Sequence, residues 1–315
     1  FVSSVQAAGT FETVEHTLPE NGSLVSYGEP MHWRVSTNGP AVYDLKVTRD
    51  VLGRIATRTE LLDGVTRSDS YAYDDAGRLV SVTRDGGAVE TFSYDPNGNR
   101  LTGGVGVATY DDRDRLIAIG SRTYTHNARG DCTAVASGGS TLVTYDHDGR
   151  GALRAVKNGG LTITYDVDAL GRRVARRENG AVTHRWLYRN AIDPVAEYDG
   201  GGQIRWRFVS SPGRHMPEIA IDASGATYKL VTDQVGSLRL VVRGADGAVV
   251  QRLRHDAWGR VEEDFVAPGF SALPFGFAGG LYDRDTGLVH FGLRDYDPAI
   301  GRWLERDRLG LGGGL

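Results

Sequence analysis

Carboxylates are the only side chains here whose spacing leaves chemistry open, because the other reactive residues form no recognisable site. Cys132 is the single cysteine among 315 residues, which excludes a disulfide framework and a cysteine-based zinc site. The eight histidines never show the His-x-x-x-His spacing of a zinc motif. There is no Gly-x-Ser-x-Gly elbow, and the glycine runs at 103–106 and 310–314 precede no expected helix, which indicates turns instead of phosphate loops. We therefore expect neither a metal nor a cofactor.

Aspartates recur directly after tyrosines, with a glycine and an arginine shortly downstream, as in the segment from Tyr73 to Leu79. The Tyr-Asp pairs begin at Tyr73, Tyr94, Tyr110, Tyr145 and Tyr165, about 15 to 35 residues apart; a further unit without the Tyr begins at Arg49, and a weaker copy begins at Tyr124. The Asp can accept hydrogen bonds from the backbone of a turn, and the Gly can adopt positive φ without strain. These repeated carboxylates are therefore predicted to shape turns and not to form repeated active sites.

The segments around each turn have the character of strands. Residues 70–73 and 78–83 are rich in β-branched and aromatic residues with alternating polarity, and no stretch shows useful helical periodicity. Each unit therefore predicts one β-hairpin, with the Tyr before the turn and the apolar residue after the Arg on one face. Because a lone hairpin is barely stable in water, neighbouring units must stack edge to edge. The expected fold is all-β: stacked hairpins that form a spiralling or curved shell.

Composition limits the possible partners. The net charge of −4 is too small to indicate a nucleic-acid or membrane partner through a long-range field, and no apolar segment approaches the length of a membrane span. The basic residues are arginines except for Lys46, Lys157 and Lys229, which fits either stacking on aromatic rings or the codon bias of a GC-rich genome. The chain begins Phe-Val-Ser-Ser without a basic leader, so we expect an internal fragment whose targeting information is missing.

The motif Tyr-Asp-x-x-Gly-Arg-Leu at roughly twenty-residue spacing resembles the YD repeat of bacterial Rhs proteins, of the B and C components of insecticidal Tc toxins, and of animal teneurins. Residues 232–260 resemble a further Rhs segment, with His255 where the family usually has Tyr. The stretch from Gly280 to Trp303 resembles the Rhs core signature Gly-x-Tyr-x-x-x-Thr-Gly-Leu-x-x-x-x-x-Arg-x-Tyr-Asp-Pro-x-x-Gly-Arg-aromatic. The expected organisation is lead-in strands at 1–40, a YD-repeat array at 41–230, and a truncated Rhs core-associated region at 231–315.

The resemblance implies a secreted or cell-surface shell that encloses and delivers a C-terminal toxin domain. Its partners would be that toxin domain, the remainder of the shell and a secretion-system delivery protein. In the family this region also carries an aspartyl autoprotease that releases the toxin inside the cage, and its residues correspond to Arg294, Asp295 and Asp307. Two close carboxylates cannot both ionise, so one would hold a proton while the other activates water.

The local pattern alone does not pair the two aspartates. Residues 297–301 predict a turn, and an ideal hairpin around it places Asp295 opposite Leu304, about three residues or roughly 10 Å from Asp307. The family usually has Asp-Pro at the second aspartate, whereas this chain has Asp307-Arg308, and the scissile bond is expected further downstream than Leu315. Two surface carboxylates beside a hairpin are the alternative interpretation.

Two other functions remain open. A cell-surface or wall-associated adhesion module would lack proteolysis and could bind carbohydrate through tryptophans such as Trp186 and Trp206, although packing is the stronger interpretation for both. A degenerate shell would retain the fold after losing cleavage at the altered Asp307-Arg308 site.

Overall fold

Three antiparallel sheets make up the fold, which confirms the all-β prediction. The computed structural model describes residues 2–7, 10–15, 32–37, 40–104, 106–211 and 215–307. Within these ranges the helical structure is limited to one 3-10 turn, η1 (Phe277–Gly279), and no helix is long and apolar enough to cross a membrane.

In each sheet, strands that follow one another in the chain are hydrogen-bonded neighbours. The first sheet contains β1 (Val2–Ala7), β2 (Thr10–Glu15), β3 (His32–Thr37), β4 (Ala41–Arg49), β5 (Ile55–Leu62), β6 (Val65–Tyr73), β7 (Leu79–Arg84) and β8 (Val89–Thr91). The second contains β9 (Ala108–Tyr110), β10 (Leu116–Ile119), β11 (Arg122–His126), β12 (Cys132–Ser137), β13 (Ser140–His147), β14 (Leu153–Asn158), β15 (Leu161–Val167), β16 (Arg173–Glu178), β17 (Ala181–Tyr188), β18 (Pro194–Asp199), β19 (Ile204–Val209), β20 (Ile219–Asp222), β21 (Thr227–Thr232), β22 (Leu238–Arg243), β23 (Val249–His255) and β24 (Val261–Val266). The third contains β25 (Leu281–Tyr282), β26 (Val289–Phe291), β27 (Arg294–Asp297) and β28 (Arg302–Trp303).

The turn at Asp74 shows why the repeat has its spacing. Gly77 has a φ of +81°, and its N–H donates to the Asp74 carbonyl oxygen at 2.9 Å. The Asp74 carboxylate accepts the backbone N–H and the Nε–H of Arg78 at 2.8 and 2.7 Å. The carboxylate thus closes the turn that the glycine permits, as predicted.

The arginine of each turn also joins one hairpin to the next. The Nη1 of Arg78 donates to the carbonyl of Asp95 at 3.0 Å, and its guanidinium carbon lies 4.8 Å from the ring centre of Tyr94. The Tyr94 hydroxyl in turn donates to the carbonyl of Leu79 at 2.6 Å. The same three contacts recur one unit earlier in the chain. The planar arginines therefore bridge neighbouring repeats through both a hydrogen bond and a stacking contact.

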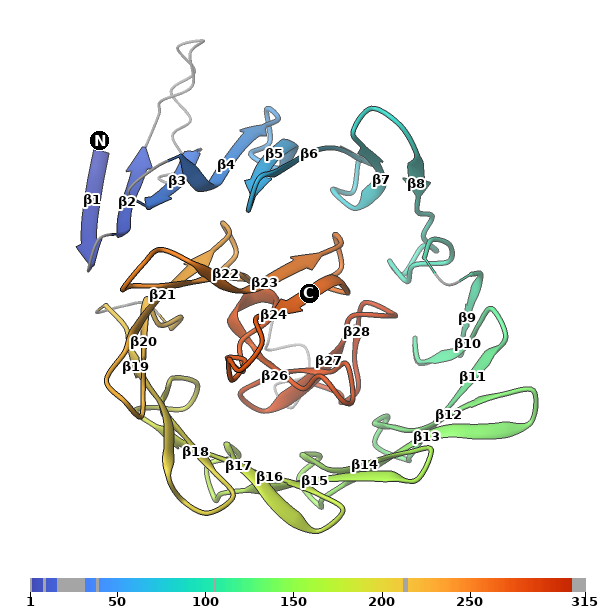
Figure 1. Ribbon diagram of the computed structural model, residues 1–315. Coiled ribbons are helices and arrows are strands. Elements are labelled where there is room, and N and C mark those ends of the chain that lie inside the picture. The colour runs from blue at the N-terminus through green and yellow to red at the C-terminus, as the bar shows by residue number, and fades with distance from the viewer. Residues whose placement is uncertain are drawn as a thin grey trace.

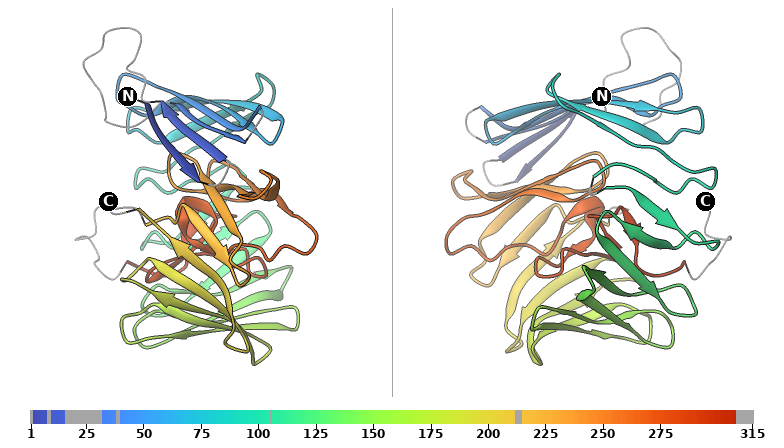
Figure 2. Two further views of the ribbon diagram at one scale, coloured as in Figure 1. Left: turned by 60° about the vertical axis from the view of Figure 1, so that its left-hand side comes forward. Right: turned by 90° about the vertical axis from the view of Figure 1, so that its right-hand side faces the viewer.

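The two large sheets form a wall that winds inward through more than one turn. Figure 1 shows β9–β24 following a curve that brings β21–β24 beneath the first sheet, and Figure 2 shows the same overlap from two other directions. Apolar side chains fill the contact, with Tyr43, Leu45 and Leu62 of the first sheet packed against Val231 and Leu240 of the second.

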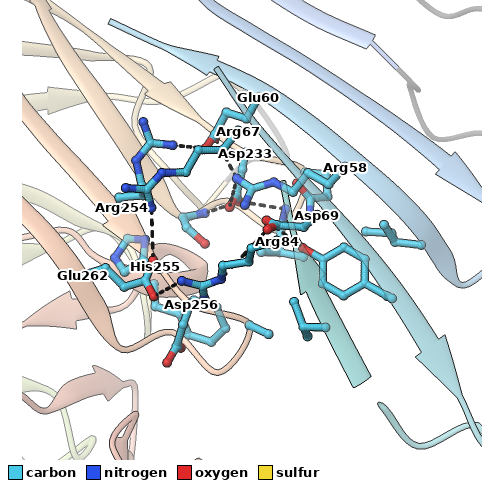
Figure 3. A pocket seen from close by; sticks show the side chains of 18 of the residues that line it. Arg58, Glu60, Arg67, Asp69, Arg84, Asp233, Arg254, His255, Asp256 and Glu262 are labelled. Carbon is cyan, nitrogen blue, oxygen red and sulfur yellow. Dashed lines mark hydrogen bonds and ion pairs between the residues drawn. The ribbon is translucent and has the colours of Figure 1, made fainter. Parts of the chain in front are cut away.

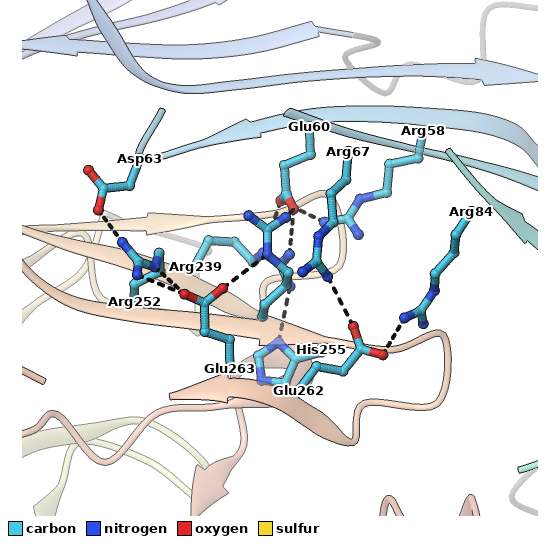
Figure 4. Close-up of polar contacts among 11 residues, drawn as sticks. Arg58, Glu60, Asp63, Arg67, Arg84, Arg239, Arg252, His255, Glu262 and Glu263 are labelled. Carbon is cyan, nitrogen blue, oxygen red and sulfur yellow. Dashed lines mark hydrogen bonds and ion pairs between the residues drawn. The ribbon is translucent and has the colours of Figure 1, made fainter. Parts of the chain in front are cut away.

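Charged groups complete this contact between the first sheet and the inner turn, which we call the seam. Glu60 of β5 is buried and accepts the Nε–H of Arg239 from β22 at 2.9 Å. Arg58 also reaches the Glu60 carboxylate, at 2.7 Å (Figure 4), and Arg254 reaches it at 3.5 Å. Ionic contacts therefore hold together segments that lie far apart in the sequence.

The third sheet lies inside the curve of the wall (Figure 1). Leu288, Ile300 and Leu304 from this region share a core cluster with Tyr145 and Ile163 on the inner face of the wall. The polypeptide after β24 is thus an inner core segment, residues 273–307, surrounded by the repeat hairpins. The predicted boundaries at 40 and 230 follow the motifs and not the sheets, and they stay a prediction.

Candidate functional site

A short hairpin of the inner core segment positions Asp295. Gly292, with a φ of +60°, and Leu293 form the turn between β26 and β27, which pairs His290 with Asp295. Because side chains alternate along a strand, Arg294 and Asp295 point to opposite faces of β27. Asp295 turns inward and is only 1% exposed.

The wall supplies the charge that balances Asp295. Arg173, at the start of β16, is buried and its Nη2 donates to the Asp295 Oδ1 at 2.7 Å. The same guanidinium lies 3.4 Å from the ring centre of Tyr165 on the neighbouring β15. A charge-assisted bond of this kind between buried groups fixes the carboxylate in place.

Asp295 is held in its ionised form by these neighbours. Burial alone would raise its pKa, but Arg173 and then His290 outweigh burial and lower the pKa to about 2. The Nδ1 of His290 lies 3.3 and 3.4 Å from the two carboxylate oxygens. Burial, followed by the charge of Arg173, lowers the pKa of His290 below its ordinary value.

Glu305 brings a second buried carboxyl to the same place. Its Oε2 accepts the backbone N–H of Asp295 at 2.8 Å, and its Oε1 lies 3.4 Å from the Nε2 of His147 on β13. Burial, reinforced by the negative charge of Asp295, raises the pKa of Glu305 to about 7. Near neutral pH Asp295 is therefore ionised while Glu305, which contacts the Asp295 backbone, still holds a proton part of the time, and this arrangement is suited to acid–base chemistry.

The predicted aspartate pair is arranged differently. The register Tyr296↔Trp303, extended by the Leu304 N–H that donates to the Asp295 carbonyl at 2.9 Å, confirms that Asp295 lies opposite Leu304. Asp307 reaches Arg294 instead, with 2.9 Å between its Oδ2 and the arginine Nη1. The structure thus joins Arg294 to Asp307 and joins Asp295 to Arg173, His290 and Glu305. The catalytic pairing of Asp295 with Asp307 stays a prediction.

Polar atoms without a hydrogen-bond partner gather around this site. They are Nδ1 and Nε2 of His147, Nε of Arg173, Nε2 of His290 and Oε1 of Glu305, all buried. Such atoms are rare in folded proteins and need an explanation where they occur. A hollow of about 720 Å³ opens beside the site, lined by Glu305 and Asp307 together with Cys132 and Arg294. Glu305 therefore lies between a buried carboxylate and an accessible space.

Sequence reasoning missed Arg173, His290, Glu305 and His147. Two of them left a signal: the turn at 292–293 places His290 opposite Asp295, and Glu305 follows Leu304, the residue predicted to face Asp295. Arg173 and His147 come from wall strands, and the sequence does not say which wall strand the inner core segment meets.

A second polar pocket lies in the seam (Figure 3). It has a volume of about 210 Å³, and Arg58, Arg84, Asp69, Asp233 and Glu262 are among the residues that line it. Most of its charges are paired across the seam, such as Arg67 with Glu262 at 3.4 Å. Its geometry is that of a contact between sheets and provides no reactive centre.

The two tryptophans considered for carbohydrate binding are buried. Trp206 is packed edge-on against Tyr228, and Trp186 donates its Nε1–H to Glu197 at 3.0 Å. The packing interpretation is therefore confirmed for both side chains.

Known proteins share this pattern along nearly the whole chain. The family model described as Teneurin YD-shell matches residues 12–310. Teneurin-4 of Homo sapiens is 28% identical over 283 residues and Teneurin-1 of Gallus gallus is 30% identical over 278 residues, covering 84% and 83% of this chain. The tRNA3(Ser)-specific nuclease WapA of Bacillus spizizenii is 23% identical over 263 residues, again 84% of the chain.

These relatives are much longer proteins, and the chain spans 10% of each of the three. Among solved structures, the TcdB2-TccC3-TEV crystal structure aligns with 97% of this chain and 22% of its own, with 15% identity and a TM-score of 0.42. The match of the family model to residues 12–310 decides the assignment. The chain belongs to the teneurin YD-shell family.

Proposed function

We propose that this chain is part of a shell that encloses and delivers a C-terminal toxin domain and cuts itself at a centre built on Asp295. The observation that carries the proposal is the inner core segment, which the wall surrounds and anchors. The Cys132 N–H donates to the Leu304 carbonyl at 2.8 Å, and Arg100 donates to the Ile300 carbonyl at 2.8 Å. We propose that the toxin domain follows this segment and therefore begins inside the shell.

The chemistry of the Asp295 site supports self-cleavage. A buried carboxylate held ionised by Arg173 can act as the base that activates water. Arg294 and Asp307, which the family signature also points to, form an ion pair on the other face of β27 and hold the end of the inner core segment. We propose that both pairs are needed for cleavage.

The wider role rests on the same architecture. The partners we propose are the chain's own toxin domain, the remainder of the shell and a secretion-system delivery protein, at a secreted or cell-surface location. The name of one relative, a nuclease specific for tRNA3(Ser), supports a toxic cargo in proteins with this shell. An adhesion module is the second candidate, favoured by 28% to 30% identity with teneurins.

Expression of the natural full-length protein beside its Asp295→Asn and Asp307→Asn variants tests the proposal. We expect two fragments from the wild type and a single band from each variant, read on denaturing gels. A wild type that stays intact, or an Asp295→Asn variant that cleaves like the wild type, would contradict self-cleavage and favour the adhesion module.

A further inference from the structure

An aspartyl centre needs one carboxyl that holds a proton beside one that is ionised, since acid and base act on the same water and carbonyl. Asp295 supplies the ionised member, because Arg173 and His290 contact its carboxylate. Asp307 directs its carboxylate to Arg294, whose side chain leaves the opposite face of β27. The inner core segment therefore needs another residue for the proton.

Glu305 has the position that this role requires. The Leu304 carbonyl is taken by the N–H of Cys132 on the wall, which anchors the backbone directly before Glu305. The Glu305 carboxyl then folds back to the Asp295 N–H at 2.8 Å, and its other oxygen is buried without a hydrogen-bond partner. The residue also lines the hollow beside the site, so its proton has a route to a bound peptide.

Ionisable groups face Glu305 from each of the elements packed around it. Asp295 approaches from β27, His147 from β13 and Cys132 from β12, and Arg173 and His290 act on Glu305 through Asp295. Burial and the negative Asp295 raise the pKa of Glu305 and outweigh His147, which lowers it, and no arginine is paired with Glu305 among the described residues. This environment favours the neutral carboxyl and keeps the proton on Glu305.

We propose that Glu305 is the acid partner of Asp295 and supplies the mobile proton of the self-cleaving centre. This inference rests on the proposed self-cleavage and assigns to Glu305 the role that the family signature leaves to Asp307. Asp307 then positions the segment by holding Arg294.

The reaction balances with water as the co-reactant. Asp295 takes one proton from water as the water oxygen bonds to the peptide carbonyl carbon, and Glu305 gives its proton to the carbonyl oxygen. The tetrahedral diol then collapses: the C–N bond breaks, the leaving nitrogen takes the proton from Asp295, and a diol hydroxyl returns its proton to Glu305. One water is consumed, one acid and one amine are formed, and both carboxyls regain their starting states.

The alternative is that Glu305 only caps the Asp295 N–H. Glu305→Gln separates the two roles, because the amide oxygen still accepts this bond whereas the side chain cannot supply an acidic proton. Glu90→Gln is a matched control: Glu90 accepts the backbone N–H of Gly104 at 3.0 Å in the first sheet, away from the site. His147→Gln removes the neighbouring imidazole and tests whether that group sets the pH dependence.

The experiment follows the cleavage rate of pulse-labelled full-length protein from cell-free synthesis, chased at a series of pH values. For the wild type we expect a rate that falls as pH rises through about 7, where Glu305 loses its proton. Glu305→Gln should slow cleavage at least about 100-fold and remove this pH limb, as expected for loss of a general acid. The limb should persist in Glu90→Gln and His147→Gln.

Glu305→Asp guards against misfolding of the amide variant, because it keeps an ionisable carboxyl but withdraws it from the Asp295 N–H. We expect slower cleavage with a displaced pH limb. Wild-type rates and an unchanged limb in Glu305→Gln, or in Glu305→Asp if the amide variant does not fold, would overturn the assignment of Glu305. A wild type that stays intact, or an Asp295→Asn variant that still cleaves, would instead overturn the proposed function and this inference with it.

Discussion

Two arginines that are neighbours in the chain show how one repeat unit serves both a turn and a buried site. Arg172 has the repeat position and donates its Nε–H to Asp168 at 2.7 Å, as the arginines of other turns do. Arg173 begins β16, points to the other side and reaches Asp295 in the interior. The doubled arginine after Gly171 was visible in the sequence, but its target was not, because Asp295 lies 122 residues further along.

Replacement of each arginine by Met tests the difference. Arg173→Met leaves a buried carboxylate without its charge partner, so we expect a loss of about 3–5 kcal/mol in the free energy of unfolding. Arg172→Met removes a pair whose arginine side chain is 23% exposed, and should cost less than about 1 kcal/mol. Urea unfolding followed by tryptophan fluorescence measures both changes, and equal losses would contradict the buried role of Arg173.

The stability that the pair of Arg173 and Asp295 contributes should decrease at low pH. Arg173, helped by His290, holds the pKa of Asp295 at about 2, below the ordinary value of about 3.9 in the unfolded chain. A lowered folded-state pKa gives stability that is fully present above about pH 4 and is lost as pH falls toward 2. The difference in the free energy of unfolding between the wild type and Arg173→Met should therefore become smaller as pH falls from about 4 to 2.

At the scale of elements, the hairpins were predictable and their contacts with the inner core segment were not. The Asp-x-x-Gly turns and the register opposite Asp295 follow from local rules, because turn chemistry and strand pairing are set by nearby residues. Gly259 shows what local rules miss. It has the positive φ of a repeat glycine, yet a Cβ there would lie 2.4 Å from the ring of Phe277 in η1.

A comparison of Gly259→Ala with Gly77→Ala separates the two demands on a repeat glycine. Both have positive φ, so each alanine should cost about 1–2 kcal/mol from backbone strain. A Cβ at Gly77 meets its nearest atom at 3.9 Å, whereas Gly259→Ala must displace Phe277 and should cost a further 1–3 kcal/mol or so from overpacking. Denaturant midpoints measure the stability of both variants. A similar shift in each would show that Phe277 moves aside without a measurable cost in stability.

At the scale of the whole molecule, the chain's path brings its first sheet over strands that follow it by about 180 residues, as in the pair Glu60 and Arg239. A curved shell was predicted from the need of hairpins to stack. A spiral was part of that prediction, but the strands that it would bring together, β4–β7 over β22–β24, were not predicted, because curvature accumulates from small rotations at each hairpin that sequence patterns do not encode. The buried charges of the seam are a consequence of this overlap.

The seam should open most easily where its buried charge is removed. Glu60→Gln leaves Arg239, Arg58 and Arg254 without their shared carboxylate and should cost about 3–5 kcal/mol, with faster hydrogen exchange in β5–β7. Glu262→Gln is the matched control: it also loses contacts to two arginines, Arg67 and Arg84, but its side chain is 18% exposed against 3% for Glu60, and it should cost under about 1 kcal/mol. Equal hydrogen-exchange rates in β5–β7 of the two variants would show that apolar packing alone closes the shell.

The wild-type seam should also depend on pH. Burial would raise the pKa of Glu60, but Arg239 and Arg58 lower it below its ordinary value, so the wild-type seam should loosen as pH falls below about 4.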